Sequence, residues 1–467
     1  MNNLLKWESE NIRPIFFKII KQSFSYLDSL DNRNTSTDYS TGLLNELPED
    51  GLGTLGTLKL FNEKFEPGII ATSGPRYLGF AIGGTTPAAI AADWLTTVYD
   101  QIPFASHKQS GIAVKIEQET IKLLRNLLGL PDTFSGGFVS GATMSNFTGL
   151  AVARQWWGQQ YGMDIAKEGF RSEIKIFAGV PHSSVFKSLS MLGIGSRNME
   201  IVNTASEDRE AIGIKDLIDK IERLNGQPFI LISSAGTVNT VDFDDLLVIS
   251  LLKRKFKFWW HIDAAFGAFA ACSTNYSHLL NGWEYADSIA VDCHKWLNVP
   301  YESAVAFLRN EYDALQVNTF QNSNAPYLGN PSDNFSYMNF LPENSRRLKA
   351  LPAWFTIMAY GKAGYNSIVD NCIDMALQLG NYIAESKQFE LLAPVRLNTV
   401  CFTLSNNASN EKIDEMLTKI NNSKKVFMTP TVLNGKKGIR AAFVNWRTSE
   451  EDVEIVKQVL KGIVIEI

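Results

Sequence analysis

Short apolar runs alternate with longer amphipathic stretches between about residue 89 and about residue 350. Apolar runs of about four to eight residues are typical of buried strands, and the stretches between them have the spacing of helices. Strands that alternate with helices form a mostly parallel sheet with helices on both faces. The pattern therefore predicts a large α/β domain over residues 89–350.

The two ends of the chain have other patterns. A helical pattern over residues 12–30 is followed by a polar linker, and we expect residues 1–88 to form a helical N-terminal segment. Beyond residue 350 a helix is followed in turn by a strand at 399–404, a helix at 411–420, a strand at 438–443 and a helix at 450–463. We therefore expect residues 351–467 to form a smaller C-terminal α/β domain.

The composition of the 467 residues is that of a large soluble enzyme, with 45% hydrophobic and 20% charged residues. The net charge of −5 gives no general attraction to nucleic acids or anionic membranes. No apolar stretch reaches the roughly 18 residues of a membrane span, and the N-terminus lacks the apolar core of a signal peptide. The four cysteines have neither metal-ligand spacing nor the density of a disulfide framework, so we expect a cytoplasmic protein without a metal site.

The most specific chemical signal is the sequence DCHKW at residues 292–296, which follows the apolar run at 287–291. Lys295 therefore stands just beyond a predicted buried strand, between a histidine and a tryptophan. A desolvated lysine has a more easily freed amine, and such an amine forms Schiff bases with aldehydes. A lysine that only ends a strand and extends to solvent is the alternative.

Asp263 ends another predicted buried strand, within residues 257–267. Residues at strand ends face the ligand crevice in open α/β sheets. A carboxylate in that position can keep the pyridine nitrogen of pyridoxal phosphate protonated, which makes the ring an electron sink. Alone, Asp263 fits a helix cap better than a cofactor contact. Together with Lys295, it indicates pyridoxal phosphate.

Two more segments fit the same cofactor. Residues 136–146 pass from a short strand through small residues into a helical pattern, and a helix start offers N–H groups to a phosphate, with Ala142 and Thr143 as the predicted contacts. Residues 174–185 form a strand that leads to His182 at a helix entry, where an imidazole can stack on the cofactor ring and touch the substrate carboxylate. An ordinary glycine turn and a helix-entry histidine are the alternatives.

The motifs, in this order along the chain, resemble those of the group II pyridoxal-phosphate-dependent amino acid decarboxylases. They are SGATMSN at 140–146, PHSS at 181–184, HIDAA at 261–265, HKW at 294–296 and SRR at 345–347. The similarity extends over nearly the whole chain, from residue 74 to residue 448. It implies the fold of the pyridoxal-phosphate-dependent transferases of fold type I, pyridoxal 5'-phosphate as cofactor, and a homodimer with its active site between the subunits.

The resemblance also implies roles for individual residues. Lys295 resembles the Schiff-base lysine, Asp263 the partner of the pyridine nitrogen, and His182 the ring-stacking histidine. The cofactor-binding set that it implies is Lys295, Asp263, His182, Ala142, Thr143, Ala265, Thr237 and His294. Asp292 departs from the family, because many relatives have an asparagine near the phosphate at this position.

A polar stretch at residues 321–344 precedes Arg346, and a long polar stretch at this point is predicted to be a functional lid. In the family a mobile loop here carries a tyrosine that protonates the substrate carbon after carbon dioxide leaves. Tyr337 lies nine residues before Arg346, the spacing of the family, so we predict it as a catalytic residue with Lys295 and His182. Tyr327 is the second candidate, and a loop tyrosine without chemical function is the alternative.

Arg440 has two interpretations. A small-domain arginine in related aminotransferases binds the substrate α-carboxylate through a bidentate contact, and an arginine here can also form a structural ion pair.

Residues 73–82 resemble the stretch that lines the side-chain pocket of aromatic decarboxylases, with Tyr77 and Phe80 as the predicted substrate contacts. Gly74 replaces the histidine that is common there. An aromatic L-amino acid is the favoured substrate. The alternatives are glutamate, aspartate or 2,4-diaminobutyrate, whose distal charge needs a buried counter-charge. Another pyridoxal-phosphate-dependent carbon–carbon lyase, an aldehyde synthase, or a catalytically silent binding protein also stays open, although intact Lys295, Asp263 and His182 argue against the last.

Overall fold

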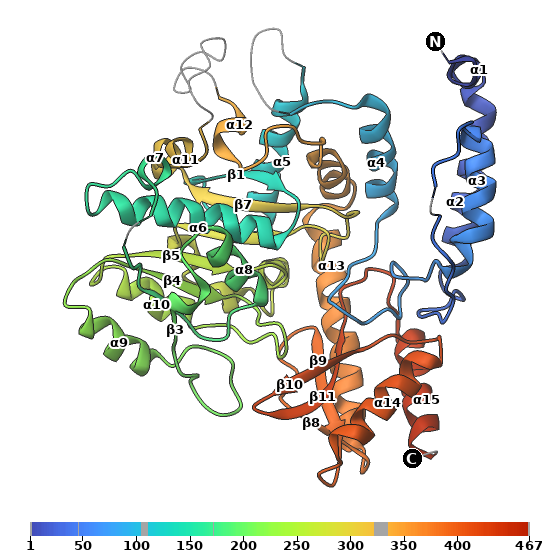
Figure 1. The fold of residues 1–467 in the computed structure, drawn as a ribbon. Helices are drawn as coiled ribbons and strands as arrows, with labels where there is room; N and C mark the ends of the chain where they lie inside the picture. Colours follow the sequence, from blue (N-terminus) through green and yellow to red (C-terminus); the bar gives the residue numbers. More distant parts are fainter. Residues whose placement is uncertain (1, 45, 104–110, 171, 322–334, 466–467) are drawn as a thin grey trace.

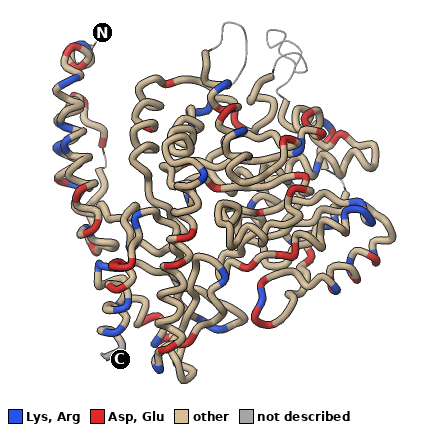
Figure 2. Tube along the Cα trace, turned by 180° about the vertical axis from the view of Figure 1, so that it is seen from behind, with Lys and Arg blue, Asp and Glu red and all other residues tan. Residues whose placement is uncertain are grey.

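The computed structural model describes residues 2–44, 46–103, 111–170, 172–321 and 335–465. Two sheets organise them (Figure 1): a seven-stranded sheet on the N-terminal side of a long helix, and a four-stranded sheet that follows it. Positively and negatively charged residues are interspersed along the trace (Figure 2), which fits the small net charge of −5.

The large sheet is mostly parallel, as predicted. Its strands are β1 (Phe134–Val139), β2 (Ile176–Ala178), β3 (Met199–Ile201), β4 (Phe229–Ser234), β5 (Phe258–Asp263), β6 (Ser288–Asp292) and β7 (Ala304–Arg309). They lie in the order β1-β7-β6-β5-β4-β2-β3. The pairs from β6 to β3 are parallel, and β7 runs antiparallel to both of its neighbours. Parallel strands end at the same edge, so the carboxyl ends of β5 and β6 lie side by side.

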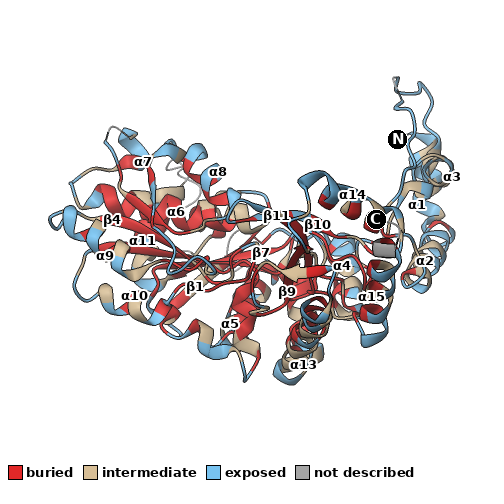
Figure 3. Ribbon diagram, turned by 90° about the horizontal axis from the view of Figure 1, so that it is seen from below, coloured by how far each residue is buried: buried red, intermediate tan, exposed pale blue. Residues whose placement is uncertain are grey.

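Helices cover both faces of this sheet (Figure 3). Side chains alternate along a strand, so Trp259 packs into one core and Trp260 into the other. The first core lies under α6 (Ala142–Gln159), α8 (Ser183–Met191) and α11 (Asp313–Phe320). The second lies under α5 (Ala113–Leu127), α9 (Ile214–Arg223), α10 (Leu246–Leu252) and α13 (Ala350–Glu385). A sheet buried on both faces explains why its strands read as continuous apolar runs.

The C-terminal part is an antiparallel sheet with helices. Its strands are β8 (Phe389–Leu391), β9 (Thr399–Leu404), β10 (Thr429–Leu433) and β11 (Lys436–Ala442), in the order β10-β11-β9-β8. The helices are α14 (Asn410–Asn422) and α15 (Glu450–Ile465). The predicted strands and helices of this part are confirmed, whereas β8 and β10 were not predicted. β8 has three residues, and β10 is exposed at every second position, so neither forms an apolar run.

The N-terminal segment forms a helical arm beside the body (Figure 1). Its helices are α1 (Asn3–Glu10), α2 (Ile12–Ser29) and α3 (Gly53–Lys64), and residues of α2 and α3 line a pocket together with Ile90 and Trp94 of α4 (Pro87–Tyr99). The predicted helix at 12–30 is confirmed as α2. The domain boundaries near residues 88 and 350 stay predictions.

The remaining helices are short. They are α7 (Ile165–Glu168), α12 (Tyr337–Phe340), η1 (Glu66–Gly68), η2 (Ser196–Asn198), η3 (Gly267–Cys272), η4 (Ser277–Leu280), η5 (Trp283–Tyr285) and η6 (Asn310–Tyr312). Among the described residues, no helix combines the length and the apolar character that crossing a bilayer requires.

Candidate active site

The carboxyl ends of β5 and β6 carry the first part of the site. Asp263 is the last residue of β5 and pairs with Ala290, two residues before Asp292 at the end of β6. Asp292 N donates a hydrogen bond to Ala265 O at 2.8 Å, which fixes the two strand ends to each other. The parallel pairing of β5 and β6 therefore brings the predicted carboxylate and the lysine segment to one edge of the sheet.

Lys295 lies just beyond this edge with 18% of its side chain exposed. Its Nζ is 2.9 Å from Asp292 Oδ2 and lies over the Phe266 ring, 5.6 Å from the ring centroid. Gly83 packs directly on the lysine backbone, because a β-carbon at Gly83 would lie 1.9 Å from Lys295 O. The segment that precedes Gly83 is thus held beside the lysine.

Asp263 is 8% exposed and has a fixed orientation. Its Oδ2 accepts a hydrogen bond from Asn146 Nδ2 at 2.9 Å, and its Oδ1 accepts one from Ala265 N at 3.2 Å. Asn146 comes from α6, one turn after the start of that helix. A carboxylate can only accept, so the Asn146 side-chain N–H group faces Asp263 and its carbonyl oxygen faces away.

The hydrogen-bond directions continue from Asn146 into the sheet. Asn146 Oδ1 lies 2.9 Å from His261 Nε2, so that nitrogen carries the hydrogen and donates. His261 Nδ1 then accepts from Ser288 Oγ at 2.8 Å, and Ser288 Oγ accepts from Trp259 Nε1 at 2.9 Å. Complete burial lowers the pKa of His261 to about 4, so the ring is neutral at neutral pH. The series of hydrogen bonds from Trp259 through Ser288, His261 and Asn146 to Asp263 therefore has a donor and an acceptor at every step, all in one direction.

His182 is the N-cap of α8, as its position at a helix entry predicted. Its Nδ1 lies 2.8 Å from Ser184 Oγ and accepts from Ser184 N at 3.2 Å. Asn146 Nδ2 donates to the same Ser184 hydroxyl at 3.1 Å, so one amide orders both Asp263 and the His182 cap. Burial lowers the pKa of His182, an effect that the charge of Asp263 partly offsets. A neutral imidazole is suited to stacking on an aromatic cofactor.

The start of α6, where a phosphate contact is predicted, lies beside Asp292. Ala142 N donates to Asp292 Oδ1 at 2.6 Å, and Thr143 follows in the same first turn. His294 is close by: Ser303 N donates to its Nδ1 at 3.2 Å, and its Nε2 lies 3.6 Å from Asp292 Oδ1. Burial lowers the pKa of His294. A helix N-terminus with adjacent N–H donors is a general site for phosphate.

This arrangement fits pyridoxal phosphate. It combines a lysine amine, a buried carboxylate of fixed orientation, a neutral imidazole and a helix N-terminus, and the charges of Asp263, Lys295 and Asp292 all act on His182. The structure thus brings together Lys295, Asp263, His182, Ala142, Thr143, Ala265 and His294, and their individual roles stay predictions.

Thr237 follows β4 and is 2% exposed. Its hydroxyl donates to Glu210 Oε2 at 2.6 Å, so its hydrogen-bonding capacity is directed to a buried glutamate. Its predicted role at the cofactor stays untested. Tyr327 lies outside the described residues.

Tyr337 begins α12 and is 2% exposed. Its ring makes an edge contact with Phe335 and lies under the guanidinium of Arg346, which is 4.8 Å from the ring centroid. Arg346 in turn forms a bidentate ion pair with the fully buried Glu117. Burial raises the pKa of Tyr337 well above its ordinary value, so the hydroxyl keeps its proton. Its role as an acid stays a prediction.

Arg440 of β11 is 9% exposed, and its charge acts on His182. Its Nη1 donates to Val238 O at 2.7 Å. Among the described residues it has no carboxylate within ion-pair distance, and its buried Nε has no hydrogen-bond partner. Of the two interpretations of Arg440, the structural ion pair therefore has no support in the described part of the chain.

Aromatic residues lie near the lysine segment, since Tyr301 is close enough to both Asp292 and Tyr77 for their charges to act on its pKa. Tyr77 stacks on Phe427 with ring centroids 4.5 Å apart and an interplanar angle of 6°, and Phe80 lies 6.0 Å from the same ring. Phe80 is 59% exposed, whereas Tyr77 is buried. Tyr301 packs on the His294 ring at 4.3 Å, and burial raises its pKa to about 12.

Sequence reasoning assigned no role to His261, Asn146, Phe427 or Tyr301. Two signals for the first two were present: His261 and Asp263 are two residues apart and so share one face of β5, and Asn146 lies one helical turn beyond Ala142. Phe427 and Tyr301 gave no such signal, because their approach depends on how the domains and loops pack.

Known proteins resemble this chain along its length. A model of the pyridoxal-dependent decarboxylase conserved domain matches residues 47–405. The aromatic-L-amino-acid decarboxylase of Bacillus atrophaeus is 28% identical over 485 aligned residues, which cover 100% of this chain and 98% of that protein.

Two solved structures show the same fold. The crystal structure of the Oryza sativa protein TDC with PLP and tryptamine matches with a TM-score of 0.89 and 21% identity over 98% of both chains. The structure of the 4-hydroxyphenylacetaldehyde synthase of Rhodiola rosea matches with a TM-score of 0.84 and 21% identity, over 100% of this chain and 99% of that one. The predicted fold type I architecture is confirmed.

Proposed function

The chain belongs to the pyridoxal-dependent decarboxylase family, and from this membership we propose that it converts an aromatic L-amino acid to the corresponding amine and carbon dioxide. The protein is a carboxy-lyase that depends on pyridoxal phosphate. One observation carries the substrate class: the segment that carries Tyr77 and Phe80, whose rings contact Phe427, continues to Gly83, which packs on the backbone of Lys295. Aromatic side chains stack favourably on such a wall.

Bound pyridoxal phosphate supplies an aldehyde that takes up the substrate amine and a ring that accepts the electron pair left by carbon dioxide. The residues of this chain do the rest. Lys295 would hold the aldehyde, and the start of α6 would hold the phosphate. Asp263, fixed by Asn146, would hold a proton at the ring nitrogen, because a charge-assisted hydrogen bond to a buried carboxylate favours the protonated form.

Three further side chains would act on the cofactor ring or on the substrate. Neutral His182 would stack on the cofactor ring, and Arg440 would bind the α-carboxylate with the guanidinium nitrogens that its backbone contact leaves free. We assign the final proton transfer to Tyr337, whose hydroxyl is protonated at neutral pH. A site that excludes water protects the carbanion until that proton arrives.

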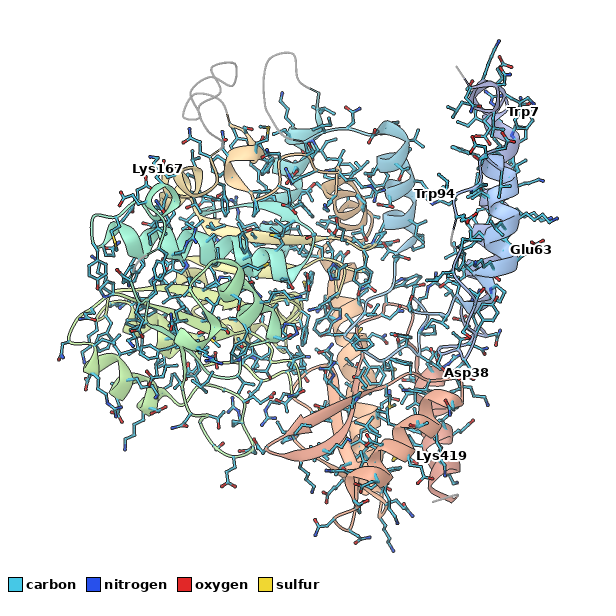
Figure 4. The ribbon with its side chains drawn as sticks, in the orientation of Figure 1. Trp7, Asp38, Glu63, Trp94, Lys167 and Lys419 are labelled. Carbon is cyan, nitrogen blue, oxygen red and sulfur yellow. The ribbon has the colours of Figure 1, made fainter. Side chains whose placement is uncertain are left out.

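We further propose that the working form is a homodimer. The arm exposes large apolar side chains: Trp7 is 50%, Phe17 71% and Phe24 56% exposed, and neither α1 nor α3 has a buried residue. Figure 4 shows Trp7 on the arm and Trp94 on α4 across from it. Such exposure is typical of protein interfaces. Light scattering should give twice the chain mass of 52.0 kDa.

A cytoplasmic location is part of the proposal. Cys272, Cys293, Cys372 and Cys401 are all free thiols, which fits a reducing compartment. Fractionation of the source cells with an antibody to the protein tests this location.

The decisive experiment measures products. Purified protein with added pyridoxal phosphate is offered tyrosine, tryptophan, phenylalanine, glutamate, aspartate and 2,4-diaminobutyrate, with Lys295→Ala as the control. Amine and carbon dioxide in equal amounts from an aromatic substrate alone support the proposal. Turnover of glutamate, aspartate or diaminobutyrate instead would replace the substrate class. Aldehyde, ammonia and hydrogen peroxide in place of amine would favour the aldehyde synthase alternative, the activity for which the Rhodiola rosea protein is named.

A further inference from the structure

Asp292 contacts groups at both ends of the proposed cofactor site. It ends β6 and is 2% exposed. Its Oδ1 accepts the hydrogen bond from Ala142 N at 2.6 Å, and its Oδ2 lies 2.9 Å from Lys295 Nζ. The first partner belongs to the helix start assigned to the phosphate, and the second is the lysine assigned to the aldehyde.

The helix start has few groups to offer an anion. α6 begins at Ala142, and Ser145 N is the first amide that donates within the helix, to Gly141 O at 2.9 Å. The N–H groups of residues 142–144 therefore precede the first helical hydrogen bond and are the donors for a phosphate. One of them already donates to the Asp292 carboxylate. A phosphate that binds at the start of α6 is therefore repelled by the carboxylate that already accepts from Ala142 N.

We propose that Asp292 competes with the cofactor phosphate for the N-terminus of α6 and with the cofactor aldehyde for Lys295, so that binding of pyridoxal phosphate requires the carboxylate to leave both contacts. The inference rests on the proposed function, which supplies the phosphate. Asp292 is then a positioning residue that lowers the affinity for the cofactor.

The groups that face Asp292 support this role. They are Lys295, His294, His182 and Tyr301. Burial lowers the pKa of both histidines and raises that of the tyrosine, so all three are neutral at neutral pH. Lys295 is left as the counter-charge of the carboxylate. When Lys295 is engaged with the cofactor, Asp292 keeps a negative charge beside the phosphate, and in the described part of the chain no other lysine or arginine forms an ion pair with it.

The test uses sulfate on the cofactor-free, full-length protein. Sulfate is a dianion throughout the neutral range and carries no aldehyde, so it reports on the helix start without the chemistry of Lys295. Asp292→Asn removes the charge and keeps an oxygen that can accept from Ala142 N. Asp287→Asn is the matched control. Asp287 is a buried carboxylate directly before the first residue of β6, and it forms an ion pair with Lys253. Binding is measured by calorimetry.

We expect Asp292→Asn to bind sulfate about tenfold more tightly than the wild type, or more, and Asp287→Asn to bind it like the wild type. The dissociation constant of pyridoxal phosphate should fall in the same variant. If Asp292→Asn lacks the circular dichroism spectrum of the folded protein, Asp292→Ser is used with the same expectation.

An unchanged or weaker sulfate affinity in the folded variant overturns the inference. A residue with only a structural role would lower the melting temperature in Asp292→Asn and Asp287→Asn alike and leave sulfate binding unchanged. The outcome is separate from that of the proposed function. Wild-type turnover with no gain in sulfate affinity rejects this inference alone, whereas a gain without any turnover rejects the decarboxylase alone.

Discussion

Replacing Asn146 with alanine should uncouple the two halves of the site. Asn146 is completely buried in α6, and its amide makes three hydrogen bonds, to Asp263, to Ser184 and to His261. Its loss leaves the Asp263 carboxylate without the donor at 2.9 Å, and it leaves the Nε2–H group of His261 without an acceptor.

The free-energy cost has two main parts. A hydrogen bond to a charged group contributes about 1.5–3 kcal/mol, and a buried donor without a partner costs about 1–3 kcal/mol. Because Asp263 and His261 both depend on the one amide, we expect Asn146→Ala to lower the free energy of unfolding by about 3 kcal/mol or more. Asp263 also loses its fixed orientation, so cofactor affinity should fall about tenfold for each 1.4 kcal/mol of lost interaction.

The control is Asn398→Ala. Asn398 is also completely buried and donates to Phe443 O at 2.7 Å, but it lies in the C-terminal domain. Urea unfolding measures the stability of each cofactor-free variant, and a titration followed by absorbance measures the dissociation constant of pyridoxal phosphate. Both variants should lose stability, and Asn146→Ala alone should lose at least tenfold in cofactor affinity.

Two results would refute the reasoning. If Asn146→Ala binds pyridoxal phosphate as tightly as the wild type, the amide does not position Asp263 for the cofactor. If Asn398→Ala loses the same affinity, the effect follows from general destabilisation and not from the site.

Three further outcomes follow from the structure. Gly83→Ala should weaken cofactor binding and turnover at least tenfold, because its β-carbon would lie 1.9 Å from Lys295 O. The control Gly462→Ala has no atom within 4 Å of its new β-carbon, so it should keep cofactor binding and turnover at wild-type values in the same assays. The pKa of His261 is lowered to about 4 in the folded protein, below the unfolded value of about 6.5, so its contribution to stability is complete above pH 6.5 and is lost as the pH falls towards 4. In urea unfolding, His261→Gln should therefore lose about 3 kcal/mol less stability than the wild type over that pH range. An equal loss of stability in both proteins would contradict a lowered pKa of His261. Arg346→Leu leaves a buried glutamate without its partner and should cost about 3–5 kcal/mol in urea unfolding at pH 7; a loss below about 1 kcal/mol would show that this ion pair does not matter for stability.

Much of the large domain could be predicted because its strands are buried on both faces. The segments that end at Asp263 and Asp292 form apolar runs, and His182 was placed at a helix entry by the strand before it. The antiparallel direction of β7 had no such signal, because an apolar run does not show in which direction its strand runs. β10 was missed because every second residue is exposed, so the strand does not form an apolar run.

The site was predictable only as far as neighbours in sequence share its chemistry. Lys295 and Asp263 stand in motifs of their own, but the hydrogen bond from Asn146 to Asp263 joins residues 117 positions apart. That contact depends on α6 packing over β5, which no local pattern specifies. Asp292 was noted as a departure from the family, yet its contact with Ala142, across 150 positions, appears only in the folded chain.

The charge balance of the site connects these observations. Asp263 and Asp292 are negative, Lys295 and Arg440 are positive, and burial keeps the imidazoles of the site neutral. These side-chain charges therefore balance one another, and a bound phosphate would add negative charge that the partial positive charge of the α6 N-terminus only partly offsets. In the proposed function, Asp263 has to stay negative to hold the ring proton, and Arg440 binds the substrate carboxylate. Asp292 is thus the group whose charge can be removed without loss of an assigned role, and its replacement by asparagine should favour the loaded protein.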